Sequence, residues 1–161
     1  MLIILEGPDG SGKSTLASAW RARYPSAISI HNGPQPGLSS SALFDEYMQQ
    51  LCLAENSQMI IDRCWVSEGV YGPIQRGSTR LTPEQVAELE AKAVGLSGLL
   101  VMCRPSFKKC LTAFESGRDE LLKSREDLWG VYSTYEFVKT ILPTVIYDYR
   151  LWPGKPEAFI T

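Results

Sequence analysis

The sequence has 161 residues, of which 44% are hydrophobic and 21% are charged, and its formal net charge is −2. A chain of this length has room for one compact domain, 1–161, that buries about 68–70% of its unfolded surface. The near-balanced charge and a sequence pI of about 5.5 provide no overall field that would hold nucleic acid, which leaves only a local basic cleft for that purpose. Because no stretch of about 18 apolar residues occurs, we expect no membrane span.

The cysteines and the start of the chain indicate a cytoplasmic protein. The four cysteines form no CxxC pair, and the single histidine has no second imidazole with which to complete a zinc site. We therefore expect reduced thiols in a reducing compartment. The apolar opening, Leu2–Leu5, has no basic segment before it and ends at Glu6, so it lacks the pattern of an export signal.

In chain order, short apolar runs alternate with longer segments of helical period. The runs predict strands at Leu2–Leu5, Ala27–Ile30, Met59–Ile61, Leu99–Cys103 and Val145–Tyr147. The longer segments predict helices at Lys13–Tyr24, Ser40–Glu55, Pro83–Val94, Ser106–Ser116 and Leu128–Leu142. Thr82 before Pro83, with Gln85 three residues after Thr82, is typical of a capped helix start.

The alternation predicts an α/β fold. Strands with almost no polar alternation are expected where helices cover both faces, so we predict a three-layer fold with a parallel sheet of about five strands. Its ligands should lie at the carboxyl ends of the strands. The charged stretch 117–127 between two predicted helices indicates either a mobile lid or a solvated helix face.

The first predicted strand leads into a phosphate-binding motif. Gly7-Pro8-Asp9-Gly10-Ser11-Gly12-Lys13-Ser14 fits GxxxxGK followed by Ser or Thr, and a helical pattern follows it, which is the context of a P-loop (Walker A) and of a P-loop NTPase fold. The glycines allow positive φ values, so that backbone N–H groups can surround a phosphate at the start of a helix. The alternative is a glycine-rich turn with a solvent-exposed lysine.

The motif predicts a site for Mg-ATP. Lys13 should reach the β- and γ-phosphates, Ser14 should ligate Mg²⁺, and Thr15 should face the α-phosphate. ATP is favoured over GTP because the sequence has no Asn/Thr-Lys-x-Asp motif. The expected ATP-binding residues are Gly7, Gly10, Ser11, Gly12, Lys13, Ser14, Thr15 and Arg104, the last because it follows the fourth strand.

A second charged cluster follows the third strand. Asp62 and Arg63 come directly after Met59–Ile61, so both should lie at the carboxyl end of a buried strand beside the phosphate loop. Asp62 can hold a Mg²⁺-bound water or position an attacking oxygen, and Arg63 offers a planar fork for a phosphate. The alternative is a structural Asp–Arg pair that closes the strand end.

Together the two motifs resemble those of thymidylate kinases. The family's phosphate loop reads EGxDGxGKST, which Glu6–Thr15 matches throughout. Its next signature resembles DRYxxSxxAYQGxxRG, and this chain has Asp62 and Arg63 followed at the same spacings by Ser67, Tyr71, Arg76 and Gly77.

The resemblance implies roles for the residues that match. Asp9 would meet the sugar hydroxyl of the acceptor, Arg63 would clamp its phosphate, and Tyr71 would lie where a 2′-hydroxyl would clash. By itself, Tyr71 is equally well read as a core aromatic residue. The implied acceptor-binding residues are Asp9, Arg63, Ser67, Glu68, Tyr71 and Arg76, and the implied catalytic residues are Lys13, Asp62, Arg63 and two lid arginines, Arg118 and Arg125.

Three departures from the family leave the acceptor base open. Cys64 replaces the tyrosine after Asp-Arg, Glu68 occupies a position that is often neutral and reads the base, and His31–Pro34 replaces a Glu-Pro-Gly-Gly loop. The short chain and the sequence Tyr71–Ile74 are similar to small phage-type relatives. Some of these relatives phosphorylate hydroxymethyluracil within DNA.

Three functions follow from these patterns. The first is an ATP- and Mg-dependent kinase of a thymidylate-like deoxynucleoside monophosphate, with a homodimer as one candidate assembly. The second is a kinase of a modified base in DNA, 5-hydroxymethyluracil, for which a basic groove is needed; its candidate residues are Arg76, Arg80, Lys108 and Lys109. The third is a non-catalytic nucleotide-binding module, which would not need the acceptor clamp that Asp62 and Arg63 predict.

Overall fold

The five predicted strands form one parallel sheet. In the computed structural model, which describes residues 1–117 and 122–151, the strand order is β2-β3-β1-β4-β5 and every neighbouring pair is parallel. The strands are β1 (Leu2–Glu6), β2 (Ile28–His31), β3 (Met59–Asp62), β4 (Leu99–Cys103) and β5 (Thr144–Tyr147). Each predicted strand is confirmed to within one residue at either end.

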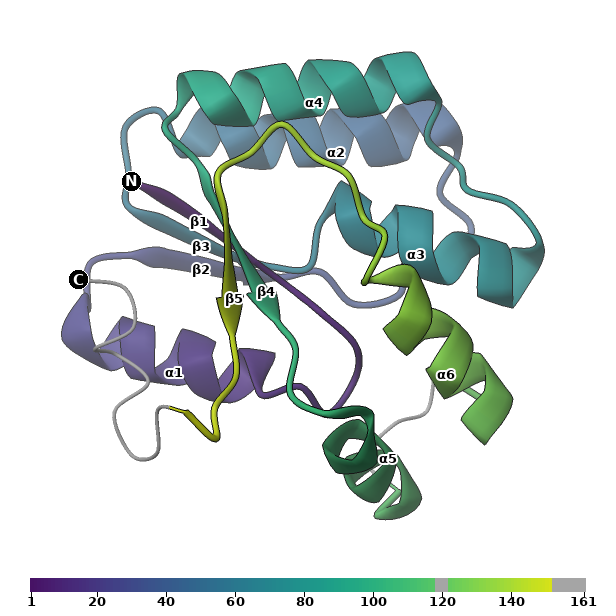
Figure 1. Ribbon diagram of the computed structural model, residues 1–161. Coiled ribbons are helices and arrows are strands. Elements are labelled where there is room, and N and C mark those ends of the chain that lie inside the picture. The colour runs from purple at the N-terminus through teal and green to yellow at the C-terminus, as the bar shows by residue number, and fades with distance from the viewer. Residues whose placement is uncertain (118–121, 152–161) are drawn as a thin grey trace.

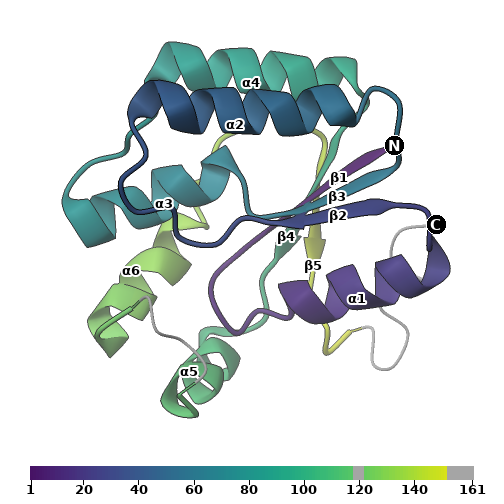
Figure 2. The same cartoon turned by 180° about the vertical axis from the view of Figure 1, so that it is seen from behind.

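The helices lie on both faces of this sheet, as the sequence predicts (Figures 1 and 2). They are α1 (Lys13–Arg23), α2 (Ser40–Leu53), α3 (Trp65–Arg76), α4 (Pro83–Gly95), α5 (Phe107–Glu115) and α6 (Arg125–Thr134). In both views α2 and α4 run side by side across one face, whereas α1 covers the other. The predicted three-layer α/β architecture is therefore correct.

The strand order determines where a ligand can lie. β1 is buried along its whole length and lies between β3 and β4, so the chain crosses from one side of β1 to the other between these two strands. A parallel sheet has an open crevice at the carboxyl ends of such neighbouring strands. The glycine-rich loop leaves β1 at this point, and Asp62 ends β3 beside it, in register with Leu5 and with His31 of β2.

One helix, α3, does not appear among the sequence predictions. Gly69, Gly72 and Pro73 lie within α3, and glycine and proline inside a segment are the usual signs of a break. The helix forms because tertiary packing outweighs these residues: most of its positions from Trp65 to Gly72 are buried.

The last helix is shifted toward the N-terminus. α6 begins at Arg125 because the Ser124 side chain accepts a hydrogen bond from the N–H of Asp127, an N-cap that places the charged residues in the first turn. It ends at Thr134, eight residues before the predicted end at Leu142. The prediction was too long because Phe137 and Ile141, which continue the apolar period, are strongly exposed. The predicted capping box of Thr82 and Gln85 is confirmed.

Two smaller expectations concern membranes and thiols. No helix in the described ranges is long and apolar enough to cross a membrane. All four cysteines are free, and three of them are buried. Burial raises the pKa of the Cys103 thiol to about 12 and that of the Cys110 thiol to about 11.

Candidate active site

The loop after β1 has the backbone that its glycines predict. Gly7, Gly10 and Gly12 have positive φ angles of 141°, 70° and 92°. At Gly7 an added Cβ would lie 2.1 Å from the carbonyl oxygen of Cys103, so the loop could not approach β4 this closely with any other residue. α1 begins at Lys13, directly after Gly12, and its free N–H groups therefore face the loop.

Lys13 lies inside this loop. Its Nζ donates hydrogen bonds to the carbonyl oxygens of Gly7 and Pro8, both at 2.8 Å, and to Ser11 Oγ at 3.3 Å. Only 5% of the residue is exposed, so the alternative of a solvent-exposed lysine does not describe it. Burial, followed by the positive charge of Arg63, lowers the pKa of Lys13. The adjacent Ser14 and Thr15 are exposed.

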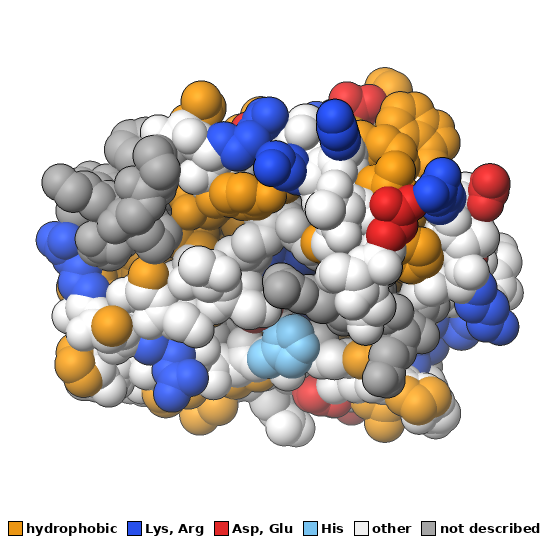
Figure 3. All heavy atoms as spheres, turned by 90° about the horizontal axis from the view of Figure 1, so that it is seen from below, with side chains coloured by type: hydrophobic (Ala, Val, Ile, Leu, Met, Phe, Trp, Pro, Cys, Tyr) orange, Lys and Arg blue, Asp and Glu red, His pale blue; other side chains and the backbone are white. Residues whose placement is uncertain are grey.

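Asp62 combines burial with an unpaired oxygen. Its Oδ2 lies 3.0 Å from His31 Nδ1, and its Oδ1 is buried with no hydrogen-bond partner among the described residues. His31, the single histidine, is 63% exposed and lies at the surface seen in Figure 3. A buried carboxylate oxygen without a donor is costly, so Asp62 Oδ1 is a candidate ligand atom for a cation.

Mg²⁺ fits the donors that the sequence predicts for it. The unpaired Asp62 oxygen and the exposed Ser14 hydroxyl are oxygen ligands, which Mg²⁺ prefers. In the described part of the chain no group of three or more acidic, histidine or cysteine side chains could hold a metal by itself. In phosphate-transferring enzymes, Mg²⁺ is usually shared by one or two protein ligands, substrate phosphates and water.

Arg63, Asp9 and Tyr71, which the resemblance assigns to the acceptor, form one cluster. Arg63 Nη2 donates to Asp9 Oδ1, and Tyr71 OH donates to Asp9 Oδ2 at 2.7 Å. The Arg63 guanidinium also lies over the Tyr71 ring, 4.8 Å from its centroid. Burial raises the pKa of Tyr71, so its hydroxyl keeps the proton that it donates. Asp9 thus connects the phosphate loop to two residues expected at the acceptor.

Arg63 has a strained backbone that its neighbours hold. Its φ is 73°, which is unusual for a residue other than glycine. The Arg63 N–H donates to the carbonyl oxygen of Leu5 at 2.9 Å, and its own carbonyl oxygen accepts from Asn32 Nδ2 at 2.7 Å. Asn32 in turn exchanges two hydrogen bonds with Gln50. Strain supported in this way is common at functional sites because it fixes the direction of a side chain.

Sequence reasoning missed the buried polar group behind this cluster. Glu6 accepts hydrogen bonds from the N–H groups of Cys64 (2.7 Å) and Ser67 (3.2 Å), from Ser67 Oγ (2.6 Å) and from Tyr135 OH (2.9 Å). It therefore joins β1, α3 and the end of α6. Ser67, expected at the acceptor, also lies 3.4 Å from Arg63 Nη1. A carboxylate before the phosphate loop was visible in the sequence, but its partner at position 135 was not.

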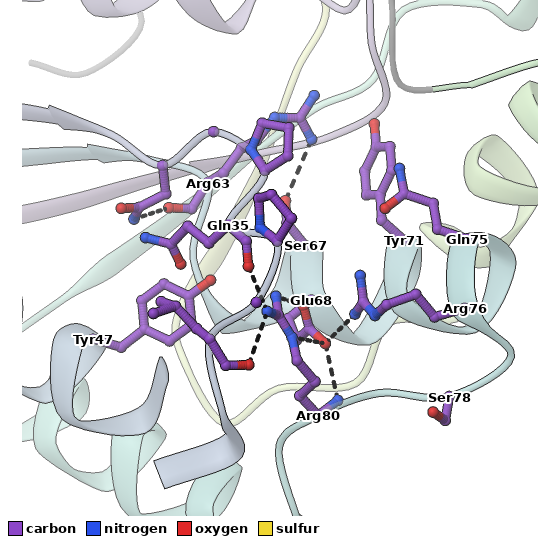
Figure 4. A pocket seen from close by; sticks show the side chains of 16 residues that line it. Gln35, Tyr47, Arg63, Ser67, Glu68, Tyr71, Gln75, Arg76, Ser78 and Arg80 are labelled. Atoms are coloured by element: carbon purple, nitrogen blue, oxygen red, sulfur yellow. Dashed lines mark hydrogen bonds and ion pairs between the residues drawn. The ribbon is translucent and has the colours of Figure 1, made fainter. Parts of the chain in front are cut away.

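A cavity of about 540 Å³ opens beside the cluster. Its walls come from the segment after β2, from Arg63 and from α3 with the turn that follows it (Figure 4). Five of the six predicted acceptor residues line it: Arg63, Ser67, Glu68, Tyr71 and Arg76. Asp9 does not line it but holds Arg63 and Tyr71.

Two of the arginines predicted for the ATP side and the lid, Arg104 and Arg125, form ion pairs with glutamates. Arg104 pairs with Glu136, and its guanidinium lies 5.1 Å from the centroid of the Tyr132 ring. Arg125 starts α6 and pairs with Glu115 of α5. Neither side chain lines the cavity. Arg118 lies outside the described residues, as do residues 118–121 of the charged segment.

Among the comparisons with known proteins, only the comparison with solved structures supports the fold. No protein-family model matches the chain, and no curated protein matches its sequence. The YorR protein of Bacillus subtilis, in complex with phosphorylated GDP, matches with a TM-score of 0.80 and 25% identity over 99% of this chain and 92% of YorR.

A second protein of similar structure is a kinase. The deoxyadenosine kinase of M. mycoides with bound dATP matches with a TM-score of 0.67 and 18% identity, over 99% of this chain and 97% of the kinase. The same kinase with dCMP and dCDP matches with a TM-score of 0.62 and 16% identity, over the same shares of each chain. The chain therefore has the fold of P-loop nucleotide kinases. The activity of this chain has to be argued from its own residues.

Proposed function

We propose that this protein is an ATP- and Mg-dependent phosphotransferase that acts on a thymidylate-like deoxynucleoside monophosphate. The observation that carries the proposal is the contact of Asp9, a residue of the phosphate loop, with both Arg63 and Tyr71 at the adjoining cavity. One loop thus borders a site for ATP phosphates and a cavity lined by a buried arginine. The size of the cavity, about 540 Å³, is within the range of small-molecule sites. Structural similarity to a deoxynucleoside kinase supports the same reading.

Each residue has a task in this reaction. The loop N–H groups and Lys13 bind the ATP phosphates, and Arg63 binds the acceptor phosphate with its planar fork. Asp62 and Ser14 would hold Mg²⁺, which neutralises charge on the transferred phosphoryl group. Tyr71 packs against Arg63 and is fixed by Asp9, so its ring can exclude a 2′-hydroxyl. Catalysis then consists of positioning and electrostatic stabilisation.

Closure of the site is a separate part of the proposal. Arg118 and Arg125 are proposed to approach the transferred phosphoryl group when both substrates bind. Arg125 would have to leave its exposed pair with Glu115 for this, which is a small cost for a surface ion pair.

A modified base in DNA is the second candidate acceptor, and one observation weighs against it. Of the four residues proposed for a DNA groove, Arg76 and Arg80 pair with Glu68 inside the cavity. Lys108 and Lys109 are exposed, and Arg76 is exposed as well but is paired with Glu68.

The test is transfer from labelled ATP with Mg²⁺ to a panel of deoxynucleoside monophosphates, deoxynucleosides and hydroxymethyluracil-containing DNA. We expect the monophosphates to be labelled, and Lys13→Ala to lose about 10²-fold or more of the activity because it removes one electrostatic donor. Lys92→Ala, on the surface of α4, is the matched control and should keep full activity. Labelling of DNA alone would establish the second candidate instead. ATP binding without labelling of any acceptor would reduce the protein to a binding module.

A further inference from the structure

The end of the cavity away from the phosphate loop carries three charged side chains that hold one another. Glu68 Oε1 accepts hydrogen bonds from the Arg80 N–H at 2.9 Å, from Arg80 Nε at 3.2 Å and from Arg76 Nη2. Glu68 Oε2 accepts from Arg80 Nη2 at 2.8 Å. All three residues line the cavity, and Figure 4 shows Glu68 between the two arginines.

Gly72 leaves the space in which this group forms. Glu68, Gly72 and Arg76 follow one another at four-residue intervals on α3 and so share one helix face. A Cβ at Gly72 would lie 2.8 Å from Arg76 Nη2, 2.9 Å from the carbonyl oxygen of Ser78 and 3.1 Å from Glu68 Oε1. A glycine inside a helix destabilises it relative to alanine. Here it allows Arg76 to fold back over its own helix and reach Glu68.

The two arginines are not equivalent. Arg80 makes hydrogen bonds on two sides. Its Nε and Nη2 donate to Glu68, and its Nη1 donates to the carbonyl oxygens of Gln35 (2.7 Å) and Leu38 (3.4 Å), which fixes the cavity wall after β2. Arg76 makes one hydrogen bond in the described part of the chain, and 39% of its side chain is exposed. Donors of Arg76 therefore remain for a ligand.

Glu68 can also accept a further hydrogen bond. Its Oε1 accepts three hydrogen bonds, whereas its Oε2 accepts one within the described ranges, so one lone-pair direction of Oε2 is left. Burial alone would raise the pKa of Glu68, but the hydrogen bonds and charges of Arg80 and Arg76 outweigh burial and lower it. The carboxylate is therefore ionised and can only accept.

We propose that Glu68 and Arg76 determine which base the acceptor carries, by selecting a lactam edge, in which a ring N–H lies directly beside a carbonyl oxygen. This inference rests on the proposed function, since it assumes that the acceptor sugar and phosphate lie at Tyr71 and Arg63. The ring N–H donates to Glu68 Oε2, and the carbonyl oxygen accepts from the Arg76 fork. Thymine, uracil and guanine have such an edge.

Adenine and cytosine fit this pair poorly. Their corresponding edge has an exocyclic amino group beside a ring nitrogen. The amino group brings two N–H donors, and Oε2 has one direction left, so the second N–H would face the donors of Arg76 or Arg80. The ring nitrogen has a single lone pair, whereas a carbonyl oxygen has two for the guanidinium fork. A buried donor left without an acceptor weakens binding.

Binding of the four common deoxynucleoside monophosphates, measured by calorimetry without ATP, tests this inference separately from catalysis. We expect the thymine and guanine compounds to bind at least about 10-fold more tightly than the cytosine and adenine compounds. Glu68→Gln should reduce that preference to within about threefold, because an amide can turn to offer either a donor or an acceptor. Glu55→Gln, an exposed glutamate paired with Lys92, is the matched control and should keep the preference.

A second variant covers the case in which Glu68→Gln does not fold. Arg76→Gln removes the fork from a half-exposed position at the end of α3 and should weaken the binding of the thymine and guanine compounds about 10-fold, with little change for the others. Equal binding of all four compounds to the unmodified protein, or an undiminished preference in the folded variants, would overturn the inference. A clear preference in binding without phosphoryl transfer would instead refute the proposed function and leave this inference intact.

Discussion

The two ends of the cavity are both charged, but they use charge differently. At the end near the phosphate loop, Arg63 lines the cavity and pairs with Asp9. Lys13 and Asp62 do not line the cavity but are buried beside this pair in the sequence of the loop and of β3, and an Asp62 oxygen has no donor among the described residues. At the far end, Glu68 Oε1 already accepts three hydrogen bonds from Arg76 and Arg80. The near end is suited to bind phosphate and metal charge, which every nucleotide brings. The far end is suited to distinguish one base from another by hydrogen bonds.

This difference predicts which substitutions should affect catalysis and which should affect specificity. Changes at the near end should reduce turnover for any acceptor, whereas changes at the far end should alter the choice among acceptors. The two ends are joined along α3, which carries Ser67 and Tyr71 toward the first and Glu68 and Arg76 toward the second. Each of the following experiments tests that separation.

The largest effect is expected from Asp62→Asn at the near end. The substitution keeps the shape of the side chain but removes the negative charge at the proposed Mg²⁺ site, so kcat should fall about 10²-fold while ATP binding changes little. Steady-state kinetics and ATP titration would measure the two quantities. Asp45→Asn, exposed on α2, is the control. If only the thermal stability of Asp62→Asn changed, Asp62 would be a structural strand-end residue.

Arg63→Lys should have the next largest effect. Lysine keeps the charge but loses the fork that binds a phosphate through two hydrogen bonds, so the KM for a monophosphate acceptor should rise about 10-fold and the KM for ATP should stay nearly constant. Arg21→Lys, exposed on α1, should change neither constant.

The same variant distinguishes free nucleotide from DNA. If the acceptor were a base in DNA, several cations would share the backbone phosphates, so the defect would be milder and would shrink at low salt. If Arg63→Lys left the acceptor KM unchanged at every ionic strength, Arg63 would not contact the acceptor.

The near end could be predicted from sequence because its residues are adjacent to strand ends. Asp9, Asp62 and Arg63 follow β1 or end β3, and neighbouring parallel strands bring their carboxyl ends together. The far end could be predicted only as a set of candidate residues, Glu68 and Arg76. Their pairing across Gly72 depends on α3, whose glycines and proline conceal the helical period. Tyr135 is 129 residues from Glu6, and no local pattern predicts that contact.

Arg80→Gln should produce a smaller effect, confined to the far end. It removes the hydrogen bonds to Glu68 and to the carbonyl oxygens of Gln35 and Leu38, so the wall after β2 loses its anchor. We expect the acceptor KM to rise a few-fold, about the effect of one net hydrogen bond, with kcat at saturation within about twofold. Arg23→Gln on α1 is the control. A loss of kcat comparable to that of Asp62→Asn would show that the two ends are not separate.

The smallest expected effect is on stability in acid, and it concerns Glu68. Its pKa in the folded protein is lowered because the hydrogen bonds and charges of Arg80 and Arg76 outweigh burial. A carboxyl group whose folded pKa lies below its unfolded value, about 4.3 for glutamate, stabilises the fold above that value and loses this contribution as the pH falls through the folded pKa. The free energy of unfolding of Glu68→Gln, from urea titrations at pH 7, 5 and 3, should therefore decrease less between pH 5 and pH 3 than that of the unmodified protein. Other carboxyl groups titrate in the same interval, so the difference between the two proteins is the quantity to compare, with Glu55→Gln as the reference for loss of one exposed carboxylate. Parallel pH profiles for Glu68→Gln and the unmodified protein would mean that the two arginines do not hold Glu68 in its charged form, and the contrast between a phosphate-binding end and an internally paired end would then not hold.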